Sequence, residues 1–214
     1  MTKADAGPSR DCALCPRLVT FRNAQRALHA DWHNAPVPSF GGLDAQLLIV
    51  GLAPGLKGAN RTGRPFTGDY AGDLLYATLL EFGFARGQYA ASADDGLALV
   101  DCRISNAARC VPPENKPLPS EIAACRPFLV AEIAAMRRLA VILALGQIAH
   151  GAVLAALAQK KSAFPFRHGA AHLLATGLRL ADSYHCSRYN TNTGKLTTTM
   201  FQSVFRQLRQ LLAA

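Results

Sequence analysis

Four of the six cysteines are spaced as metal ligands often are. Cys12 and Cys15 are two residues apart, so their thiolates can bind one metal centre from a single turn. Cys110 precedes a pair of prolines, and Cys125 follows it after fourteen intervening residues. Two neighbouring donors and two distant ones form a set that suits either Zn²⁺ or an iron–sulfur cluster. The alternative is that these are ordinary buried thiols.

A second pattern competes for the first two cysteines. His29 and His33 follow them at the loose spacing of a zinc finger. A zinc finger needs an aromatic residue and a leucine inside this interval, where the chain has Val19 and Gln25. The interval also has the apolar spacing of one continuous helix. We therefore interpret both histidines as ordinary helical positions.

The other two cysteines lie in different surroundings. Cys102 belongs to a strand-like run, and we expect it to be a small buried apolar residue. Cys186 follows His185, and the sequence leaves open whether its thiol is inert or reactive.

Three polar loops carry the other candidates for chemistry. The first is rich in glycine between residues 51 and 68, so its backbone can approach an anion or a flat ring closely. Within it, Phe66 is either a core residue or a platform on which a base stacks. Asp69 ends the loop, either in a chemical role or as the cap of a helix beginning near Tyr70.

The second loop follows a strand-like run that ends at Asn106. The amide of Asn106 offers both a donor and an acceptor, so it can read one edge of a pyrimidine. The prolines that follow stiffen the segment leading to Asn115 and Lys116. Simple turn chemistry is the alternative for both asparagines.

The third loop begins at His185 and is rich in hydroxyl and amide side chains, with cations at Arg188 and Lys195. Such a loop can follow a phosphate backbone. A single histidine is more often structural than catalytic, and His150, His168 and His172 are equally available. Only the expected convergence of the three loops favours His185.

These loops must be positioned by regular elements. Apolar, β-rich runs occupy residues 47–50, 97–100, 141–145 and 178–181, and helical apolar spacing occurs at 75–82, 122–133 and 200–211. Strands that alternate with helices predict a three-layer αβα fold with a mostly parallel sheet of about four strands. Ligands bind beyond the carboxyl ends of such strands, so the three loops should share one crevice.

Length, charge and hydropathy narrow the class of protein. The 214 residues fit one domain, half of them are apolar, and 23 basic against 14 acidic residues give a net charge of +9. This excess favours a polyanionic partner. Loop-like segments contain many of the cations: Lys57, Arg61, Arg64, Lys116, Arg188 and Lys195. The absence of a bilayer-length apolar run and of a signal peptide predicts a soluble intracellular protein that does not bind membranes, whose thiols stay reduced.

The runs GLAPG, NRTGRPFTGD, ISNAARCVPPENKP and YHCSRYNT together resemble the uracil-DNA glycosylase superfamily. They are most similar to its iron–sulfur branch, often called family 5 or type B, from Cys12 to beyond Lys195. The resemblance implies a uracil-DNA-glycosylase-like fold over residues 1–214 and a [4Fe–4S] cluster. The implied ligands of that cluster are Cys12, Cys15, Cys110 and Cys125.

The resemblance also implies roles for single residues. Phe66 would stack on the flipped base, Asn106 would bind its edge, and His185 would stabilise charge on the departing base. Asp69 and Asn115 match positions that place or activate water. The remaining base-binding positions are Gly51, Leu52, Ala53, Pro54 and Gly55. The implied DNA contacts are Arg61, Arg64, Lys116, Ser187, Arg188, Asn190 and Thr191.

Two residues depart from related families. Leu52 stands where other families hold the attacking water with a polar side chain, and this apolar residue is associated with broader substrates that include deaminated purines such as hypoxanthine and xanthine. Cys186 replaces a more common proline or valine, for which we expect a modest change in loop geometry.

The expected activity is monofunctional hydrolysis of uracil from DNA. A lyase reaction through Lys57 or Lys116 is possible in principle, but nothing in their context suggests an activated amine. We expect a monomer in a bacterial-type cytoplasm, associated with the nucleoid. The alternatives are a non-catalytic nucleic-acid-binding module organised by zinc, and an electron-transfer protein.

Overall fold

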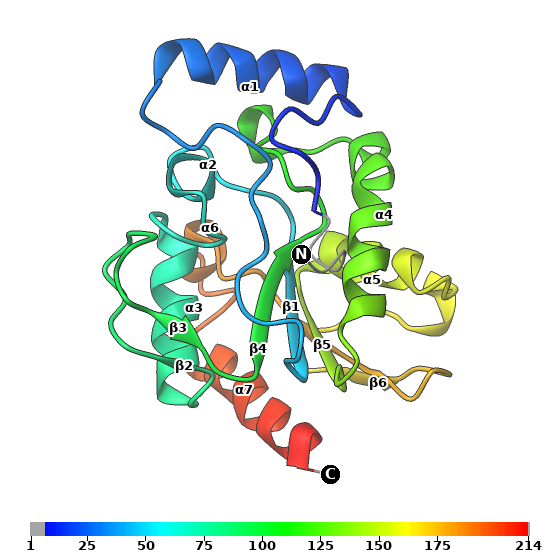
Figure 1. Ribbon diagram of the computed structural model, residues 1–214. Helices are drawn as coiled ribbons and strands as arrows, with labels where there is room; N and C mark the ends of the chain where they lie inside the picture. The colour runs from blue at the N-terminus through cyan, green and yellow to red at the C-terminus, as the bar shows by residue number, and fades with distance from the viewer. Residues whose placement is uncertain (1–6, 214) are drawn as a thin grey trace.

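Five strands form the central sheet in the computed structural model, which describes residues 7–213 (Figure 1). In spatial order they are β4 (Cys102–Asn106), β1 (Leu47–Gly51), β5 (Val141–Leu145), β7 (Arg179–Ser183) and β6 (Ala171–Leu173). The first four are parallel, and β6 pairs antiparallel with β7 at one edge. The expected sheet of about four strands is therefore confirmed as its parallel part, and β6 adds a fifth strand.

Each face of the sheet is covered by two long helices (Figure 1). On one face, α3 (Tyr70–Glu81) and α7 (Thr198–Ala213) pack on alternate residues of β1 such as Leu47 and Ile49. On the other, α4 (Pro119–Ala135) and α5 (Gln147–Ala156) pack on Leu48 and Val50. The parallel strands are buried on both faces, so they read as continuous apolar runs. This confirms the three-layer αβα architecture.

Short elements complete the described chain. The N-terminal helix α1 (Pro16–Leu28) lies across the top of the molecule in Figure 1. The remaining helices are α2 (Ala59–Thr62) and α6 (Arg188–Asn192), with 3₁₀ turns η2 (Pro113–Asn115) and η3 (Lys161–Ala163). A small hairpin consists of β2 (Ala85–Arg86) and β3 (Ala98–Leu99).

The prediction of a sheet strand at 97–100 is wrong. Only Ala98 and Leu99 are extended, and they belong to the hairpin outside the central sheet. Asp101 then adopts a left-handed conformation with φ of 50°, which turns the chain before β4 begins at Cys102. The partner of β1 is therefore the next run along, which ends at the predicted Asn106.

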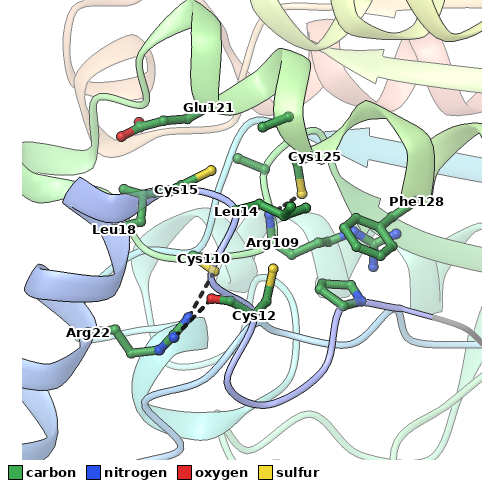
Figure 2. Close-up of a pocket in the computed structure, with 13 residues that line it drawn as sticks. Cys12, Leu14, Cys15, Leu18, Arg22, Arg109, Cys110, Glu121, Cys125 and Phe128 are labelled. Carbon is green, nitrogen blue, oxygen red and sulfur yellow. Dashed lines mark hydrogen bonds between the residues drawn. The ribbon is translucent and has the colours of Figure 1, made fainter.

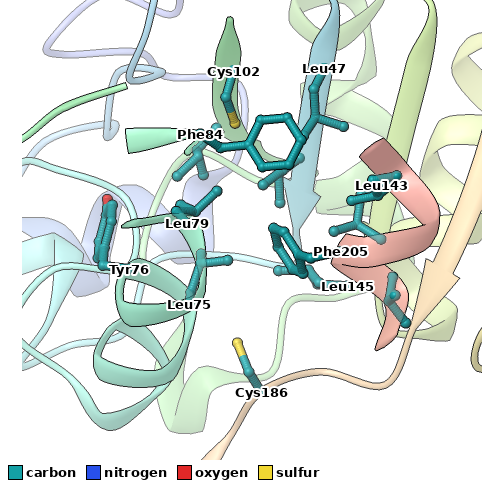
Figure 3. Packing of buried hydrophobic residues seen from close by; sticks show 14 of the residues in the cluster. Leu47, Leu75, Tyr76, Leu79, Phe84, Cys102, Leu143, Leu145, Cys186 and Phe205 are labelled. Carbon is teal, nitrogen blue, oxygen red and sulfur yellow. The ribbon is translucent and has the colours of Figure 1, made fainter. Parts of the chain in front are cut away.

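The two cysteines outside the metal-like set are buried in the core (Figure 3). Cys102 is 1% exposed and Cys186 is 0% exposed, both against residues of β1, α3 and α7. Burial raises the pKa of the Cys186 thiol to about 12, so this thiol stays protonated and unreactive at neutral pH. The buried role expected for Cys102 is confirmed.

Among residues 7–213, no helix combines the length and apolar character needed to cross a membrane.

Candidate functional site

A cleft of about 650 Å³ opens where the loops after β1, β4 and β7 meet. All three polar loops singled out in the sequence contribute to it, as the topology predicts. The predicted residues that line it are Leu52, Ala53, Pro54, Gly55, Phe66, Asp69, Asn106, Asn115, His185, Ser187 and Arg188. The convergence of the loops is therefore confirmed.

Asn106 lies at the inner end of the cleft with its side chain against β1. It is 3% exposed, and its Oδ1 is buried with no hydrogen-bond partner in the protein. Gly51 is directly opposite in the sheet, where a Cβ atom would come within 2.4 Å of that oxygen and 2.6 Å of the Phe66 ring. Glycine is thus required at residue 51, which supports the cleft from behind. A buried acceptor without a partner costs free energy unless a ligand supplies the donor.

Phe66 is both a core residue and a wall of the cleft. Its side chain is 7% exposed and packs with the core on the α3 side of the sheet. Its ring stacks near His185, with ring centroids 5.9 Å apart and planes 29° apart. The backbone at Phe66 has φ of 53°, which is strained for a residue with a side chain. Strain of this kind persists only where the surroundings hold the residue in place.

Arg64 belongs to the structure that holds Phe66, and its surroundings argue against the DNA contact predicted for it. Its side chain is 5% exposed and forms two 2.7 Å hydrogen bonds to the carboxylate of Asp95. A further 2.7 Å bond runs from its Nε to Thr67. The guanidinium also lies over three aromatic rings, those of Phe40, Tyr76 and Tyr89. A guanidinium that is buried and paired in this way is poorly placed to meet a phosphate.

His185 projects from the loop after β7 into the cleft. Desolvation lowers the pKa of its imidazole to about 4, so the ring is neutral at physiological pH. The side chain of Asn190 donates a 2.8 Å hydrogen bond to the His185 carbonyl, which fixes the loop. A neutral imidazole can still donate one hydrogen bond to a developing negative charge.

Asp69 combines the two roles considered for it. It caps α3 by accepting a 3.2 Å hydrogen bond from the amide of Gly72, and it also lines the cleft. Gly58 allows its carboxylate to lie close, because a Cβ there would be 2.4 Å from Oδ2. Burial raises the pKa of Asp69 despite the amides of Gly72 and Ala71, which lower it. A carboxylate whose pKa is raised is a stronger base than an ordinary aspartate, which suits it to accept a proton.

The other predicted DNA contacts differ in their surroundings. Ser187 and Arg188 line the cleft, whereas Thr191 bonds to backbone carbonyls of its own turn. Arg61 and Lys116 are exposed but do not line the cleft, and Lys116 pairs with Glu114 at 3.2 Å.

Two residues of the cleft were not predicted from the sequence as site residues. Tyr70 was expected only near the start of a helix, and Lys57 was not predicted to contact DNA. Lys57 lines the cleft, and Tyr70 lies at the first position of α3 with Arg188 5.3 Å above its ring. Lys57 could have been found as the cation nearest Gly55 in the first loop. No sequence signal pairs Tyr70 with Arg188, because that contact joins two distant segments.

The four cysteines meet at a second pocket, outside the cleft (Figure 2). Cys12 and Cys15 approach it from the segment before α1, Cys110 from the loop after β4 and Cys125 from α4. Apolar neighbours such as Leu14, Leu18 and Phe128 share the lining. Burial raises the pKa of the Cys110 thiol to about 11. A bound metal must therefore displace these protons.

Donors and spacing define what this pocket can hold. Arg22 contacts the Cys110 sulfur at 3.7 Å, and the Arg109 amide donates to the Cys125 sulfur at 3.4 Å. Zn–S bonds of about 2.3 Å in a tetrahedron would bring the sulfurs within about 3.8 Å of one another. Within residues 7–213, no three of these sulfurs lie within 4.8 Å of one another. The sulfurs are therefore spread more widely than the ligands of a single zinc ion, a spacing that suits a multi-iron cluster better.

The competing zinc-finger pattern is absent from the described residues. Helix α1 ends at Leu28, and His29 stacks on Trp32 with ring centroids 3.9 Å apart. His33 lies beyond the helix, where its Nε2 is 3.2 Å from the carbonyl of Pro36. Neither histidine groups with the cysteines among the described residues, and the prediction that both lie within the helix is wrong.

Comparison with known proteins agrees with this geometry. A family model described as the uracil DNA glycosylase superfamily matches residues 38–209. The chain is 45% identical over 205 residues to the type-5 uracil-DNA glycosylase of Thermus thermophilus, covering 94% of this chain and 93% of that protein. It is 41% identical over 208 residues to the type-5 uracil-DNA glycosylase of Mycobacterium tuberculosis, covering 94% and 78%. A type-4 uracil-DNA glycosylase of Thermotoga maritima is 36% identical over 125 residues, covering 58% and 51%. The chain therefore belongs to the uracil DNA glycosylase superfamily.

Proposed function

We propose that this protein is a monofunctional uracil-DNA glycosylase, which hydrolyses the bond between uracil and deoxyribose in DNA. The observation that carries the proposal is the buried, unpartnered Oδ1 of Asn106 in a cleft walled by Phe66. Uracil supplies what this oxygen lacks, because its ring N–H can donate to Oδ1 while the adjacent carbonyl accepts from the amide NH₂. Stacking on Phe66 then holds the flat ring.

The same geometry favours other deaminated bases. Hypoxanthine and xanthine present a ring N–H beside a carbonyl, as uracil does, whereas cytosine and adenine present an unprotonated ring nitrogen beside an amino group. Leu52, which lines the cleft, is apolar and adds no polar group that would distinguish uracil from hypoxanthine or xanthine. We therefore include hypoxanthine and xanthine in the proposed substrate range.

Catalysis follows from three groups around the flipped nucleotide. Breaking the glycosidic bond leaves negative charge on the base, and the neutral His185 donates a hydrogen bond to it in a desolvated site. Asp69 accepts a proton from the attacking water, and Asn115, at the rim of the cleft, helps to place that water. Extrusion of the base costs about a few kcal/mol, least when the base is mispaired.

Cations around the cleft mouth suit a DNA backbone. Lys57 and Arg188 line the cleft, and the whole chain carries a net charge of +9. Each phosphate contact releases counterions, so binding should weaken as salt rises.

The proposed cofactor is a [4Fe–4S] cluster held by Cys12, Cys15, Cys110 and Cys125. Its support is the apolar pocket in which the four cysteines meet, the wide spacing of their sulfurs and the N–H donors to two of them. When bound, it supplies a cross-link between the N-terminal segment, the loop after Asn106 and α4. The reacting atoms are left to the cleft, which none of these cysteines line.

The first test replaces Asn106 with alanine and measures single-turnover release of uracil from a duplex. We expect the rate to fall about 10²–10³-fold, the usual cost of removing one positioned hydrogen-bonding group. The matched control is Asn23→Ala, the same change on an exposed position of α1, which should keep the wild-type rate. Release of uracil by Asn106→Ala at the wild-type rate would contradict the assigned role.

The same assay on a panel of bases tests the substrate range. Hypoxanthine and xanthine should be released by the wild-type protein and lost in Asn106→Ala, and cytosine should not be released. Release of uracil alone would restrict the proposal to that base.

A further inference from the structure

A second polar cluster lies on the opposite side of β7 from the core that contains Phe66. His150 of α5, His172 of β6 and Asp182 of β7 each offer one donor atom, and the three atoms lie within 4.8 Å of one another. Asp182 is 0% exposed and His150 is 4% exposed. None of the three lines the cleft or the cysteine pocket.

Both ring nitrogens of His150 face an oxygen that can accept a hydrogen bond. Its Nε2 is 2.8 Å from the carbonyl of Phe164, and its Nδ1 is 2.7 Å from Oδ1 of Asp182. A neutral imidazole has only one N–H, so it cannot donate to both. A positive charge is therefore required between Nδ1 and the carboxylate, either a proton or a metal ion.

His172 supplies the second and independent observation. Its Nε2 is buried without a hydrogen-bond partner, although it lies 3.4 Å from Oδ2 of Asp182. A proton on His150 would satisfy the first contact and leave His172 with only this approach to Oδ2, to which the Arg167 amide also donates at 3.4 Å. One metal ion between the three side chains satisfies both nitrogens and the carboxylate at once.

We propose that His150, His172 and Asp182 form a Zn²⁺ site. Zinc binds imidazole nitrogen and carboxylate oxygen at about 2.0–2.2 Å, so tetrahedral donors lie about 3.3 Å apart. The two contacts to the carboxylate, 2.7 Å from His150 to Oδ1 and 3.4 Å from His172 to Oδ2, lie on either side of this value. The Phe164 carbonyl would fix the ligand tautomer of His150, as second partners of zinc-binding histidines do. His172, with 16% of its side chain exposed, provides an entry path.

The site would fasten three elements together. It would join α5 and the edge strand β6 to β7, and β7 leads directly into the loop that carries His185. A three-residue edge strand has few other attachments. We therefore expect zinc to raise thermal stability rather than to take part in base release.

The test compares wild-type, cluster-loaded protein with His172→Gln and with the control His29→Gln, which alters a histidine outside the cluster. Zinc chloride is added after removal of loose metal, and bound zinc is measured by equilibrium dialysis. Wild type and His29→Gln should bind one more ion per chain than His172→Gln. With zinc at about 100 times its dissociation constant, their Tm should rise by about 5–10 °C, and that of His172→Gln should not.

Cobalt distinguishes this site from the cysteines. Co²⁺ at His150, His172 and Asp182 should give weak visible bands that His172→Gln lacks, without the intense ultraviolet charge-transfer bands of a thiolate ligand. Equal zinc binding and equal Tm shifts in wild type and His172→Gln would overturn the proposal. So would the absence of any zinc binding by wild type, because a proton on His150 would then be the charge between the two groups.

Discussion

At the scale of single residues, the carboxyl group of Asp69 serves both the helix and the cleft. Its Oδ1 accepts from the first turn of α3, and burial raises its pKa above the ordinary aspartate value. His185 changes in the opposite sense, because the same loss of solvent favours its neutral form and lowers its pKa to about 4. The same desolvated cleft therefore makes Asp69 a stronger base and keeps His185 neutral, as the proposed reaction requires.

The pH profile of kcat/KM should separate these two groups. Asp69 must be ionised to accept a proton, so activity should fall as pH drops through its raised pKa, while His185 stays neutral down to about pH 4. Asp69→Asn should lower the plateau by about 10²–10⁴-fold and abolish the acid limb. His185→Ala should lower the plateau but keep that limb. A wild-type rate that declines as pH rises through about 6.5 would mean that His185 acts as an imidazolium.

At the scale of elements, the loop between α2 and α3 is built around a buried ion pair. Arg64 and Asp95 have side chains 5% and 1% exposed, and Arg64 also bonds Thr67, the residue after the strained Phe66. The hydroxyl of Tyr76 donates a 2.6 Å bond to the carbonyl of Pro65, the residue before it. Phe66, the proposed stacking platform, is therefore fixed from both sides by residues that do not line the cleft.

Removal of the Asp95 carboxylate should loosen the loop that holds Phe66. Asp95→Ala leaves the Arg64 charge buried and unpaired, so the free energy of unfolding should fall by roughly 3–5 kcal/mol. Urea denaturation measures this loss, and kcat/KM on a uracil duplex should fall with it because Phe66 is less well held. The neighbouring Asp94→Ala, at an exposed position, is the control and should change neither quantity. An Asp95→Ala protein as stable as wild type would contradict a stabilising role for the ion pair between Arg64 and Asp95.

At the scale of the whole molecule, the two pockets share one structural support. Glu132 of α4 bonds Arg103 of β4 at 2.6 Å and Ser105 at 2.7 Å, and it also pairs with Arg109, next to Cys110. This buried network ties the helix that carries Cys125 to the strand that ends at Asn106. The cysteine pocket and Asn106 are thus joined by one buried network.

Loss of one cysteine should therefore affect folding more than chemistry. Cys110→Ser should lose the visible absorption expected of the proposed cluster and show a large fall in Tm and in the yield of folded protein. Cys102→Ala is the matched control, since it changes a buried cysteine outside the pocket. It should keep the absorption and lose only the modest stability expected for a small core change. A Cys110→Ser protein with wild-type Tm and activity would contradict a structural role for the cluster.

Much of the fold was predictable because its signals are local. The apolar runs at 47–50, 141–145 and 178–181 are strands, and the three helical stripes fall on α3, α4 and α7. Alternation of strand and helix then restricts the topology to a parallel sheet. The prediction of a sheet strand at 97–100 was wrong because β-propensity does not reveal which of two adjacent extended segments pairs with β1.

The sequence by itself determined which side chains reach the carboxyl edge of the sheet, because strand ends and loop composition are local properties. Asn106, His185 and the loop of Phe66 could be named for this reason, and so could the four cysteines. Tertiary structure decided which charges are free. The sequence predicts that Arg64 is a free loop cation, but in the structure it is paired with Asp95, thirty-one positions away. It also gathered His150, His172 and Asp182, since contacts between α5, β6 and β7 leave no mark on local sequence spacing. Pairing over long separations depends on packing, which acts only once the chain has folded.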